Sequence, residues 1–340
     1  MTTQGQVEDR RLQLLHHWLE NELGLTQYTL APASADASFR RYFRLTQDGD
    51  TRIIMDAPPG KEDIHPFINI AALLRSLGLN APEVMEQNLE QGFLLLSDLG
   101  QRDYLSALNE ASVEQLYGDA LQALFALQAC SLPTEYPLPP YDLTRLMNEM
   151  GLFRDWYLGR HLRLEMIPDL RFMLDEVFSA LADNALQQPQ VCVHRDYHSR
   201  NLMLCEPNPG VIDFQDAVLG PVTYDLVSLL RDCYIAWPRE RVEGWVAQYH
   251  ATITAAGRLD GVELAQFLHW FDLMGVQRHL KATGIFARLN YRDAKPGYLA
   301  DIPRTMGYVK EVCARYTVLQ PLGYLVEELE ARGEQFLPPA

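Results

Sequence analysis

The sequence lacks the features that identify disulfide-rich, zinc-binding, membrane-spanning or secreted proteins. Its five cysteines are an odd number with wide spacing and no C-x-x-C pair, which argues against a disulfide framework and against a zinc knuckle. No window approaches about 18 uninterrupted apolar residues, so no membrane span is expected. The N-terminal stretch lacks the apolar core of a signal peptide. We therefore expect free thiols in a reducing cytoplasm.

Positive charge is also scarce. The chain has 29 Lys and Arg residues against 45 Asp and Glu residues, a net charge of −16. A protein that follows nucleic acid along its phosphates needs a basic face, and the overall field here opposes both nucleic acid and anionic membrane. With 340 residues, 48% of them hydrophobic, the chain can form one large domain or two lobes with a sizeable core.

The predicted secondary structure changes near residue 100. Before it, a helical pattern that begins at residue 7 and stops at Gly24 precedes β-like runs separated by turn signals, with another helix at 66–79. After it, most segments read as helices, beginning with a strongly amphipathic one at 112–130. This predicts an α+β protein of two lobes, a small β-rich N-lobe at 1–98 and a larger, mainly helical C-lobe at 99–340. The β-like runs lie at 28–33, 38–46, 51–57, 82–89 and 92–100.

The stretch VCVHRDYHSRNLMLCEPNPGVIDFQD, residues 191–216, places many polar groups between apolar runs. Asp196 stands five residues before Asn201, and Asp213 follows the apolar residues Val211 and Ile212. Phosphoryl transfer needs a carboxylate near the acceptor hydroxyl and hard oxygen ligands that hold Mg²⁺ on a triphosphate. The spacing H-R-D-x-x-x-x-N with a later apolar-D-F is typical of this chemistry. It predicts Asp196 as the base and Asn201 and Asp213 as metal ligands.

The two histidines of this stretch leave alternatives open. A metal-dependent hydrolase would use His194, Asp196 and His198 as ligands, although the remaining histidines fall mostly in helical or N-terminal contexts. His194 is more typical of a packed, hydrogen-bonded residue beneath the loop, and His198 is expected near the reacting groups in either case. A polar loop without chemistry is the third interpretation.

At these residues the sequence resembles a known family. VHRDYHSRN and VIDFQDAVLGPVTYDLVSLLRD resemble the aminoglycoside phosphotransferase and choline kinase-like superfamily, which has a protein-kinase-like two-lobe fold. Together with SFRRYFRL, IIMDAPPGKED and GFLLLSDLG, they are similar to one bacterial branch, the anomeric N-acetylmuramate/N-acetylglucosamine kinases of cell-wall recycling. The resemblance covers nearly the whole chain. It implies ATP and Mg²⁺ as cofactors, and it implies that Asp225 ties the catalytic loop to a helix N-terminus.

The resemblance also implies a nucleotide site in the N-lobe. SADASFRRYFRL stands where kinases keep the loop that covers the phosphates, but it lacks glycines, so serines and backbone groups would approach the phosphates instead. LLLSDLG matches the hinge, where the backbone of Leu96 and Asp98 would hydrogen-bond adenine. The implied residues are Ser34, Ser38, Phe39, Arg40, Arg41, Arg44, Leu96, Asp98 and Leu99.

One position departs from the kinase pattern. The strand TRIIMDAPP carries Met55 where a phosphate-binding lysine is expected, and the following helix offers no obvious glutamate partner. Arg41 and Arg44 are candidates to supply the missing charge, with Lys61 a weaker one. The gap also keeps open a nucleotide-binding regulator without turnover.

The acceptor is expected to contact the helical lobe. LMNEMGLFRDWYLGRH and SLLRDCYIAWP combine aromatic rings that can stack on a sugar with cations that can bind a carboxylate; ordinary core packing is the alternative for each ring. Arg231 is the favoured partner of an acidic group. The candidate residues are Glu149, Arg154, Trp156, Tyr157, His198, Arg231 and Tyr234.

The resulting expectation is ATP-dependent phosphorylation of the anomeric hydroxyl of N-acetylmuramate and N-acetylglucosamine to give the sugar 1-phosphate. The acceptor could instead be an aminoglycoside, choline or homoserine. We expect a cytoplasmic monomer whose partners are an amino sugar and ATP, with no nucleic acid and no membrane.

Overall fold

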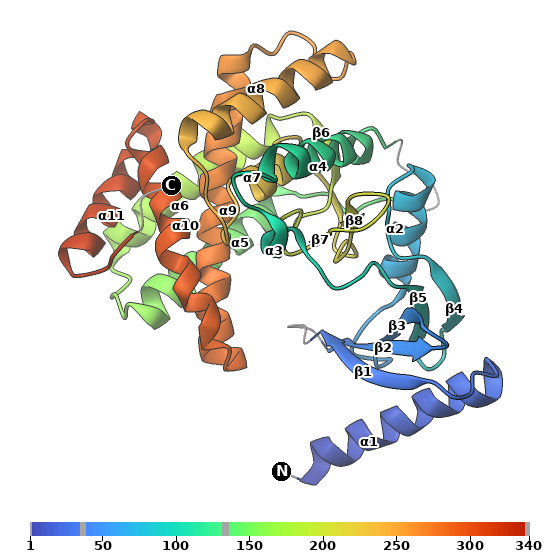
Figure 1. Cartoon of the computed structure of the whole chain (residues 1–340). Helices are drawn as coiled ribbons and strands as arrows, with labels where there is room; N and C mark the ends of the chain where they lie inside the picture. Colours follow the sequence, from blue (N-terminus) through green and yellow to red (C-terminus); the bar gives the residue numbers. More distant parts are fainter. Residues whose placement is uncertain (1, 35–38, 131–135, 337–340) are drawn as a thin grey trace. The chain divides into compact units, whose positions relative to one another are not determined.

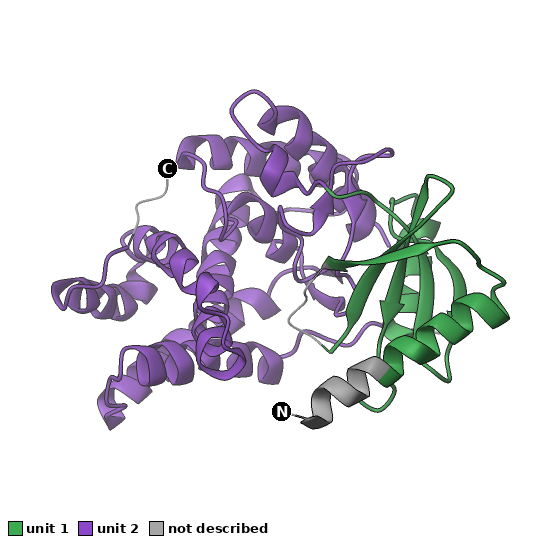
Figure 2. Ribbon diagram, turned by 60° about the horizontal axis from the view of Figure 1, so that its bottom comes forward, with its two compact units in different colours: residues 1–101 green, residues 102–340 purple. Residues whose placement is uncertain are grey.

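The computed structural model describes residues 2–34, 39–130 and 136–336, with side chains from Arg10 onward except at Ser34. The chain forms two compact units, Met1–Gln101 and Arg102–Ala340, which Figure 2 draws in green and purple. The boundary between residues 98 and 99 stays a prediction about where the folding domains divide.

Unit 1 is built on a five-stranded antiparallel sheet in the order β1-β2-β3-β5-β4 (Figure 1). A short turn at Asp48 and Gly49, both with positive φ, joins β2 to β3. The strands are β1 (Thr29–Ser34), β2 (Arg41–Gln47), β3 (Asp50–Asp56), β4 (Val84–Asn88) and β5 (Phe93–Ser97). The helices are α1 (Thr2–His17), the π-helical turn η1 (Trp18–Glu22) and α2 (His65–Ser76).

The core of unit 1 lies between the N-terminal helix and one face of this sheet. Leu15 and Trp18 pack with Ile54 of β3 and with Phe93 of β5, and all four side chains are buried. The Trp18 and Phe93 rings stack at 5.7 Å between centroids. Since successive side chains of a strand point to opposite faces, the equally buried Met55 faces away from this cluster.

Unit 2 is mostly helical, with four short strands that form two antiparallel pairs, β6–β9 and β7–β8. The strands are β6 (Gln190–Val193), β7 (Leu202–Met203), β8 (Gly210–Val211) and β9 (Val218–Pro221). The helices are α3 (Tyr104–Ala107), α4 (Val113–Gln128), α5 (Leu143–Leu152), the π-helical η2 (Phe153–His161), α6 (Pro168–Leu186), α7 (Tyr224–Leu230), α8 (Arg239–Ala255), α9 (Leu264–Asp293), the 3-10 turn η3 (Pro296–Asp301), α10 (Ile302–Cys313), the 3-10 turn η4 (Thr317–Leu319) and α11 (Gln320–Ala331).

Helix α9 is the central element of unit 2. It has 30 residues and packs against α5, η2, α6, α7, α8, η3 and α10 (Figure 1). Residues on every side of its middle turns are buried, including the polar Gln277, Arg278, His279 and Lys281. A helix that is buried all round belongs to a core. Its polar side chains therefore need partners inside the protein.

The predicted strands and helices of unit 1 are confirmed to within a few residues, and so is the helical character of the C-terminal part. No helix in the described residues is long and apolar enough to cross a membrane. All five cysteines are free thiols. The buried ones have raised pKa values because burial disfavours the thiolate, to about 12 for Cys313.

Candidate active site

The polar stretch at 191–216 runs from β6 past β8, and its residues 194–201 form the loop between β6 and β7. Apolar residues hold both sides of it, since Val193 pairs with Val218 and Leu202 pairs with Val211. Inside the loop, the N–H of His198 donates to the carbonyl of Asp196 at 3.0 Å, and the N–H of Asn201 donates to that of His198 at 2.9 Å. These turns give the loop a fixed shape.

Asp225, in the first turn of α7, ties this loop down. Its carboxylate accepts the backbone N–H of His194 at 2.6 Å and that of Arg195 at 3.0 Å. The carboxylate of Asp232 anchors the loop at a second point, where it accepts the backbone N–H of Ser199 at 2.9 Å. Burial raises the pKa of Asp225 to about 6, although His194 and the two backbone donors lower it. The predicted anchoring role of Asp225 is confirmed.

His194 lies beneath the loop as a packed residue. Its Nε2 contacts the carbonyl oxygen of Ile212 at 3.0 Å, and its Nδ1 is 3.3 Å from the N–H of Asp196. With Nε2–H as donor and Nδ1 as acceptor, both ring nitrogens are used inside the protein. No lone pair is left for a metal ion, and the described residues hold no group of three or more His, Cys, Asp or Glu side chains placed to bind one. His194 is therefore not placed to be a metal ligand, as the hydrolase interpretation requires.

Asp196 is a half-buried carboxylate surrounded by cations. Burial opposes its ionisation, but Lys281, His198, Arg278 and Arg195 act in the other direction and hold its pKa well below the usual range. Burial also lowers the pKa of His198 to about 4. His198 is therefore neutral near pH 7, where the effect on Asp196 comes from the lysine and the arginines. Asp196 is an ionised hydrogen-bond acceptor at that pH.

Asn201 and Asp213 lie side by side next to Asp196. The amide nitrogen of Asn201 donates to the Asp196 carbonyl at 2.9 Å and to Asp213 Oδ2 at 3.4 Å. Two donor contacts fix the orientation of the amide, so its oxygen lies on the other side. Asp213 and Arg195 both have positive φ, +63° and +79°, a conformation that concentrates at functional sites. One amide and one carboxylate oxygen fit a hard cation such as Mg²⁺.

Two cations of α9, Arg278 and Lys281, act on the charge of Asp196. The sequence alone predicted neither of them. Lys281 donates to the hydroxyl of Tyr224 at 2.9 Å and lies 3.3 Å from Glu149 Oε2. Glu149 also pairs with Arg195 and accepts the hydroxyl of Tyr141. The segment QRHLK could have revealed them. Charged residues in a long apolar helix are buried, and buried charges need partners inside the protein. The predicted substrate residue Glu149 thus lies at the β6–β7 loop, where it pairs with Arg195 of the loop and with Lys281 of α9.

Aromatic rings pack against the loop at His198 and Arg200. His198 meets the Tyr234 ring edge-on at 5.3 Å, and the guanidinium of Arg200 lies 3.6 Å from the centroid of that ring. Tyr234 is also tilted against Phe286 at 6.3 Å, and Phe286 stacks on Tyr298 at 5.7 Å. The predicted substrate residues His198 and Tyr234 are therefore neighbours of each other, and His198 is in contact with Asp196. An aromatic face with adjacent hydrogen-bonding groups can bind a sugar ring.

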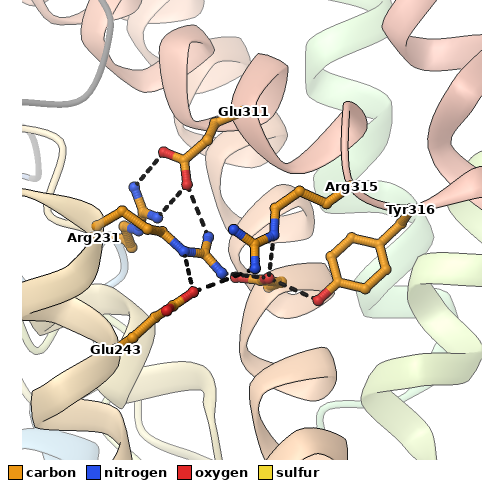
Figure 3. A network of polar contacts seen from close by, with 7 residues as sticks. Arg231, Glu243, Glu311, Arg315 and Tyr316 are labelled. Carbon is orange, nitrogen blue, oxygen red and sulfur yellow. Dashed lines mark hydrogen bonds and ion pairs between the residues drawn. The ribbon is translucent and has the colours of Figure 1, made fainter.

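Arg231 has a different setting from the one expected for an acceptor ligand. It is 3% exposed, and its two terminal nitrogens donate to Glu311 at 3.0 and 2.7 Å. Glu311 also accepts from Arg239 at 2.9 Å, and Arg239 pairs in turn with Asp272 at 2.8 Å. Figure 3 shows this network, in which a carboxylate of the protein already holds Arg231. The network is completed by Glu243, Arg315 and Tyr316.

The predicted acceptor residues of η2 lie apart from these contacts. Arg154 is partly exposed and pairs with Asp155 at 3.0 Å and Asp175 at 3.3 Å. Tyr157 is fully buried and stacks on His161 at 5.7 Å. Trp156 is half-buried. None of these described contacts reaches the loop, so their role in acceptor binding stays a prediction.

The predicted nucleotide residues of unit 1 include two arginines that are engaged in ion pairs. Arg41 shares the buried carboxylate of Asp56 with Arg11. Arg44 donates to both oxygens of Asp98, at 2.6 and 3.0 Å. Burial opposes ionisation of Asp98, but Arg44 and the N–H of Gly100 hold its pKa below the usual range. Both candidates for the missing lysine charge are therefore matched by carboxylates within unit 1.

The other predicted nucleotide residues are more varied. Phe39 is exposed, and its N–H donates to Glu62 at 3.1 Å, while Arg40 lies 3.8 Å from the same carboxylate. Leu96 is buried in the sheet and Leu99 is half-buried. Ser38 lies outside the described residues, as does the side chain of Ser34. Their nucleotide contacts stay predictions.

Comparison with known proteins agrees with this arrangement. The model of the phosphotransferase enzyme family matches residues 29–261. The chain therefore belongs to the phosphotransferase enzyme family, and the predicted superfamily and two-lobe α+β fold are confirmed.

Individual relatives carry a narrower name. The chain is 47% identical to the N-acetylmuramate/N-acetylglucosamine kinase of Pseudomonas putida over 95% of its length and 98% of the relative. It is 45% identical to the kinase of the same name from Pseudomonas aeruginosa, over 96% and 99%. Among solved structures, ADP-bound aminoglycoside phosphotransferase is similar with a TM-score of 0.57 and 13% identity, over 87% of this chain and 97% of that one.

Proposed function

We propose that this protein transfers the γ-phosphoryl group of ATP to the anomeric hydroxyl of N-acetylmuramate and N-acetylglucosamine, which yields the sugar 1-phosphate in cell-wall recycling. The observation that carries the proposal is the ionised carboxylate of Asp196 beside the Asn201–Asp213 pair. The names of the relatives support the choice of acceptor.

In this proposal Asp196 acts on the acceptor. Its carboxylate accepts the hydrogen bond of the anomeric hydroxyl and orients the oxygen for in-line attack on phosphorus. Because the pKa of Asp196 is low, the proton moves to it late, as the new P–O bond forms and the hydroxyl becomes acidic. The anchors Asp225 and Asp232 hold the loop, so that the carboxylate is placed before the substrate arrives.

Asn201 and Asp213 would hold Mg²⁺ through the amide oxygen and the carboxylate. When bound, this ion neutralises negative charge on the phosphates of ATP during transfer. Fixing the Asn201 amide through its nitrogen keeps its oxygen ready as a ligand. The same contact joins the metal site to the backbone of Asp196, so the acceptor and the phosphates are aligned by one loop.

The sugar would contact the aromatic side of the loop, with His198 and Tyr234 as the predicted residues that the structure brings together. His198 is neutral near pH 7, and its buried Nδ1 has no hydrogen-bond partner within the protein. A hydroxyl or amide group of the acceptor would satisfy it. We propose a monomeric, cytoplasmic enzyme, in keeping with small-molecule substrates.

The test is release of ADP from ATP and Mg²⁺ with N-acetylmuramate, N-acetylglucosamine, glucose, kanamycin, choline, homoserine or no acceptor. We expect turnover on the two N-acetyl sugars and a phosphorus NMR signal of an anomeric phosphate. Asp196→Asn should lower kcat by about three orders of magnitude or more, the scale of removing a catalytic group. Asp183→Asn, the same change at an exposed position of α6, is the matched control.

The outcomes separate the alternatives. Turnover only on kanamycin, choline or homoserine would keep the phosphotransferase chemistry and reject the sugar. ATP binding without turnover on any acceptor would favour a nucleotide-binding regulator. Full activity of Asp196→Asn would reject the assigned role of this carboxylate.

A further inference from the structure

Arg278 of α9 is a buried guanidinium that forms no ion pair with a carboxylate of the described residues. It is 5% exposed, its Nε has no hydrogen-bond partner, and Nη1 has only a weak contact with the sulfur of Cys233 at 3.8 Å. Burying an unpaired charge costs several kcal/mol. Its charge favours the ionised form of Asp196, but this leaves the hydrogen-bonding capacity of its Nε unused.

Other buried cations of unit 2 are matched. Arg231 forms a two-point pair with Glu311. Lys281, one turn along α9 from Arg278, pairs with Glu149 and donates to Tyr224. Against these, Arg278 makes no ion pair with any carboxylate among the described residues, although it lies in the same buried region.

Arg278 also lies close to Asp196 and to Cys233. The groups that act most strongly on it are Cys233, Tyr224, Asp196 and Asp232. Cys233 directly precedes Tyr234, whose ring contacts His198 and Arg200. The unmatched charge is thus next to Asp196 and next to the aromatic cluster.

The two proposed acceptors differ by one charged group. N-acetylmuramate carries a lactyl ether with a carboxylate, and N-acetylglucosamine has a hydroxyl in its place. A guanidinium binds a carboxylate through two parallel hydrogen bonds, and Arg278 has an Nε without a partner and an Nη1 with only the weak sulfur contact. We propose that Arg278 is the binding site for the lactyl carboxylate of N-acetylmuramate, an inference that rests on the proposed function.

The proposal takes the place of the sequence-based choice of Arg231. Both arginines are buried, but Glu311 satisfies Arg231, and a substrate carboxylate would have to displace that partner at a cost. Binding to Arg278 replaces an unpaired charge by a paired one. N-acetylglucosamine brings no charge to Arg278, so its binding does not depend on the guanidinium.

The experiment is steady-state kinetics of Arg278→Gln and Arg278→Lys with both sugars. Because Arg278 also acts on the charge of Asp196, we expect Arg278→Gln to lower kcat for both sugars by a common factor. Beyond this, kcat/KM for N-acetylmuramate relative to that for N-acetylglucosamine should fall about 30- to 100-fold, the scale of losing a charged hydrogen bond. This selective loss should appear mainly in KM, and Arg278→Lys should recover part of it because it keeps the charge.

A matched control is Arg288→Gln, the same change in the same helix at a residue that is not among the charges acting most strongly on Asp196. It should leave the ratio of the two kcat/KM values unchanged. A second measurement needs no variant: in the wild type, kcat/KM for the uncharged methyl ester of N-acetylmuramate should be lower than that for the acid by the factor of the selective loss. An ester that the wild type uses as well as the acid would overturn the proposal.

Equal losses on both sugars would also overturn it, since Arg278 would then act on the phosphoryl group or on the fold rather than on the lactyl carboxylate. That result leaves the proposed function intact, because the wild type still uses both sugars. If the wild type uses neither sugar, the proposed function fails, and this inference fails with it.

Discussion

At the scale of single residues, the candidate site shows how two acidic groups of the same site acquire different properties. Asp196 is ionised because cations from α9 and the loop outweigh its burial. Asp225 is buried with backbone donors as its closest partners, and its pKa rises to about 6. The first is suited to accept a hydrogen bond from a substrate, and the second is suited to hold the loop.

The anchoring contact predicts the effect of Asp225→Asn. Asparagine has one oxygen and one NH₂ group, so it can accept from only one of the two N–H groups of His194 and Arg195. The other buried N–H is left facing a donor, at a cost of about 1–3 kcal/mol. We expect a lower thermal midpoint and a fall in kcat of about tenfold or more, since the loop no longer holds Asp196 in place.

Calorimetry and steady-state kinetics check this prediction, with Asp183→Asn as the exposed control. A variant with the wild-type midpoint and kcat would show that the loop holds its shape without the second hydrogen bond.

Some residues of the site could be predicted from the sequence and others could not. Asp196, Asn201 and Asp213 lie within one short stretch, so their spacing alone predicted their neighbourhood. The partner of Arg231 is Glu311, 80 positions further along the chain, and local patterns carry no information on such a pairing. Arg278 and Lys281 were missed because charges in a helical pattern usually indicate a solvated face.

At the scale of elements, α9 depends on a backbone-to-backbone approach at Gly284. A Cβ there would lie 2.3 Å from the carbonyl carbon of Leu152 and 2.5 Å from the nitrogen of Phe153. These two residues are the junction between α5 and η2, so only glycine permits the contact. Gly275, nine residues earlier in α9, has room: its nearest neighbour is the Val227 side chain at 3.7 Å.

Two alanine substitutions in α9 should therefore have opposite effects. Gly284→Ala pushes α9 away from backbone atoms that cannot rotate aside, and we expect a loss of about 1–3 kcal/mol in the free energy of unfolding. Gly275→Ala removes backbone freedom from the unfolded chain without a clash and should stabilise by about 0.5–1 kcal/mol.

Urea unfolding followed by circular dichroism distinguishes the two variants. Equal midpoints for Gly284→Ala and Gly275→Ala would contradict the close approach of α9 to Leu152 and Phe153.

The elements themselves were largely predictable. The strands of unit 1 alternate apolar and polar residues and are separated by glycine and aspartate turns, and such local signals are read directly from the chain. The π-helical turns η1 and η2 were not predicted, since they continue the helical pattern of α1 and α5 with a wider spacing. The close contact at Gly284 depends on a segment more than 100 residues away and has no local signature.

At the scale of the whole molecule, buried histidines set the dependence of stability on pH. Burial lowers the pKa of His198 to about 4, that of His279 to about 3, and that of His194 below its usual value. Between the unfolded value near 6.5 and these folded values, the unfolded chain binds more protons. Unfolding is therefore favoured as the pH falls through this range. Asp225 acts oppositely, because its raised pKa gives the folded state an extra proton between about 3.8 and 6.

The destabilising effect of the three histidines in acid exceeds the stabilising effect of Asp225, so the folded state loses stability as the pH falls. We expect the free energy of unfolding to fall by at least about 1 kcal/mol per pH unit between pH 6 and pH 5, since His198 and His279 each contribute up to about 1.4 kcal/mol per unit and Asp225 offsets part of this. His194 adds to the fall. His279→Gln keeps a donor for the carbonyl of Arg231, which His279 contacts at 2.8 Å, and removes the titrating ring. This variant should have a shallower slope by about 1.4 kcal/mol per unit.

Urea midpoints measured at half-unit steps from pH 7 to pH 5 check the slope for both proteins. Parallel curves for wild type and His279→Gln would mean that another group carries the acid sensitivity.

The arrangement of α9 also bears on how acceptor preference can change during evolution. Asp272, near the N-terminal end of α9, is held by Arg239, and Gly284 fits against Leu152 and Phe153 further along. Arg278 lies between these two fixed points. A substitution at that turn alters the charge offered to the acceptor without displacing the helix. New acceptors can thus be sampled by single mutations while the phosphate-handling loop is inherited unchanged.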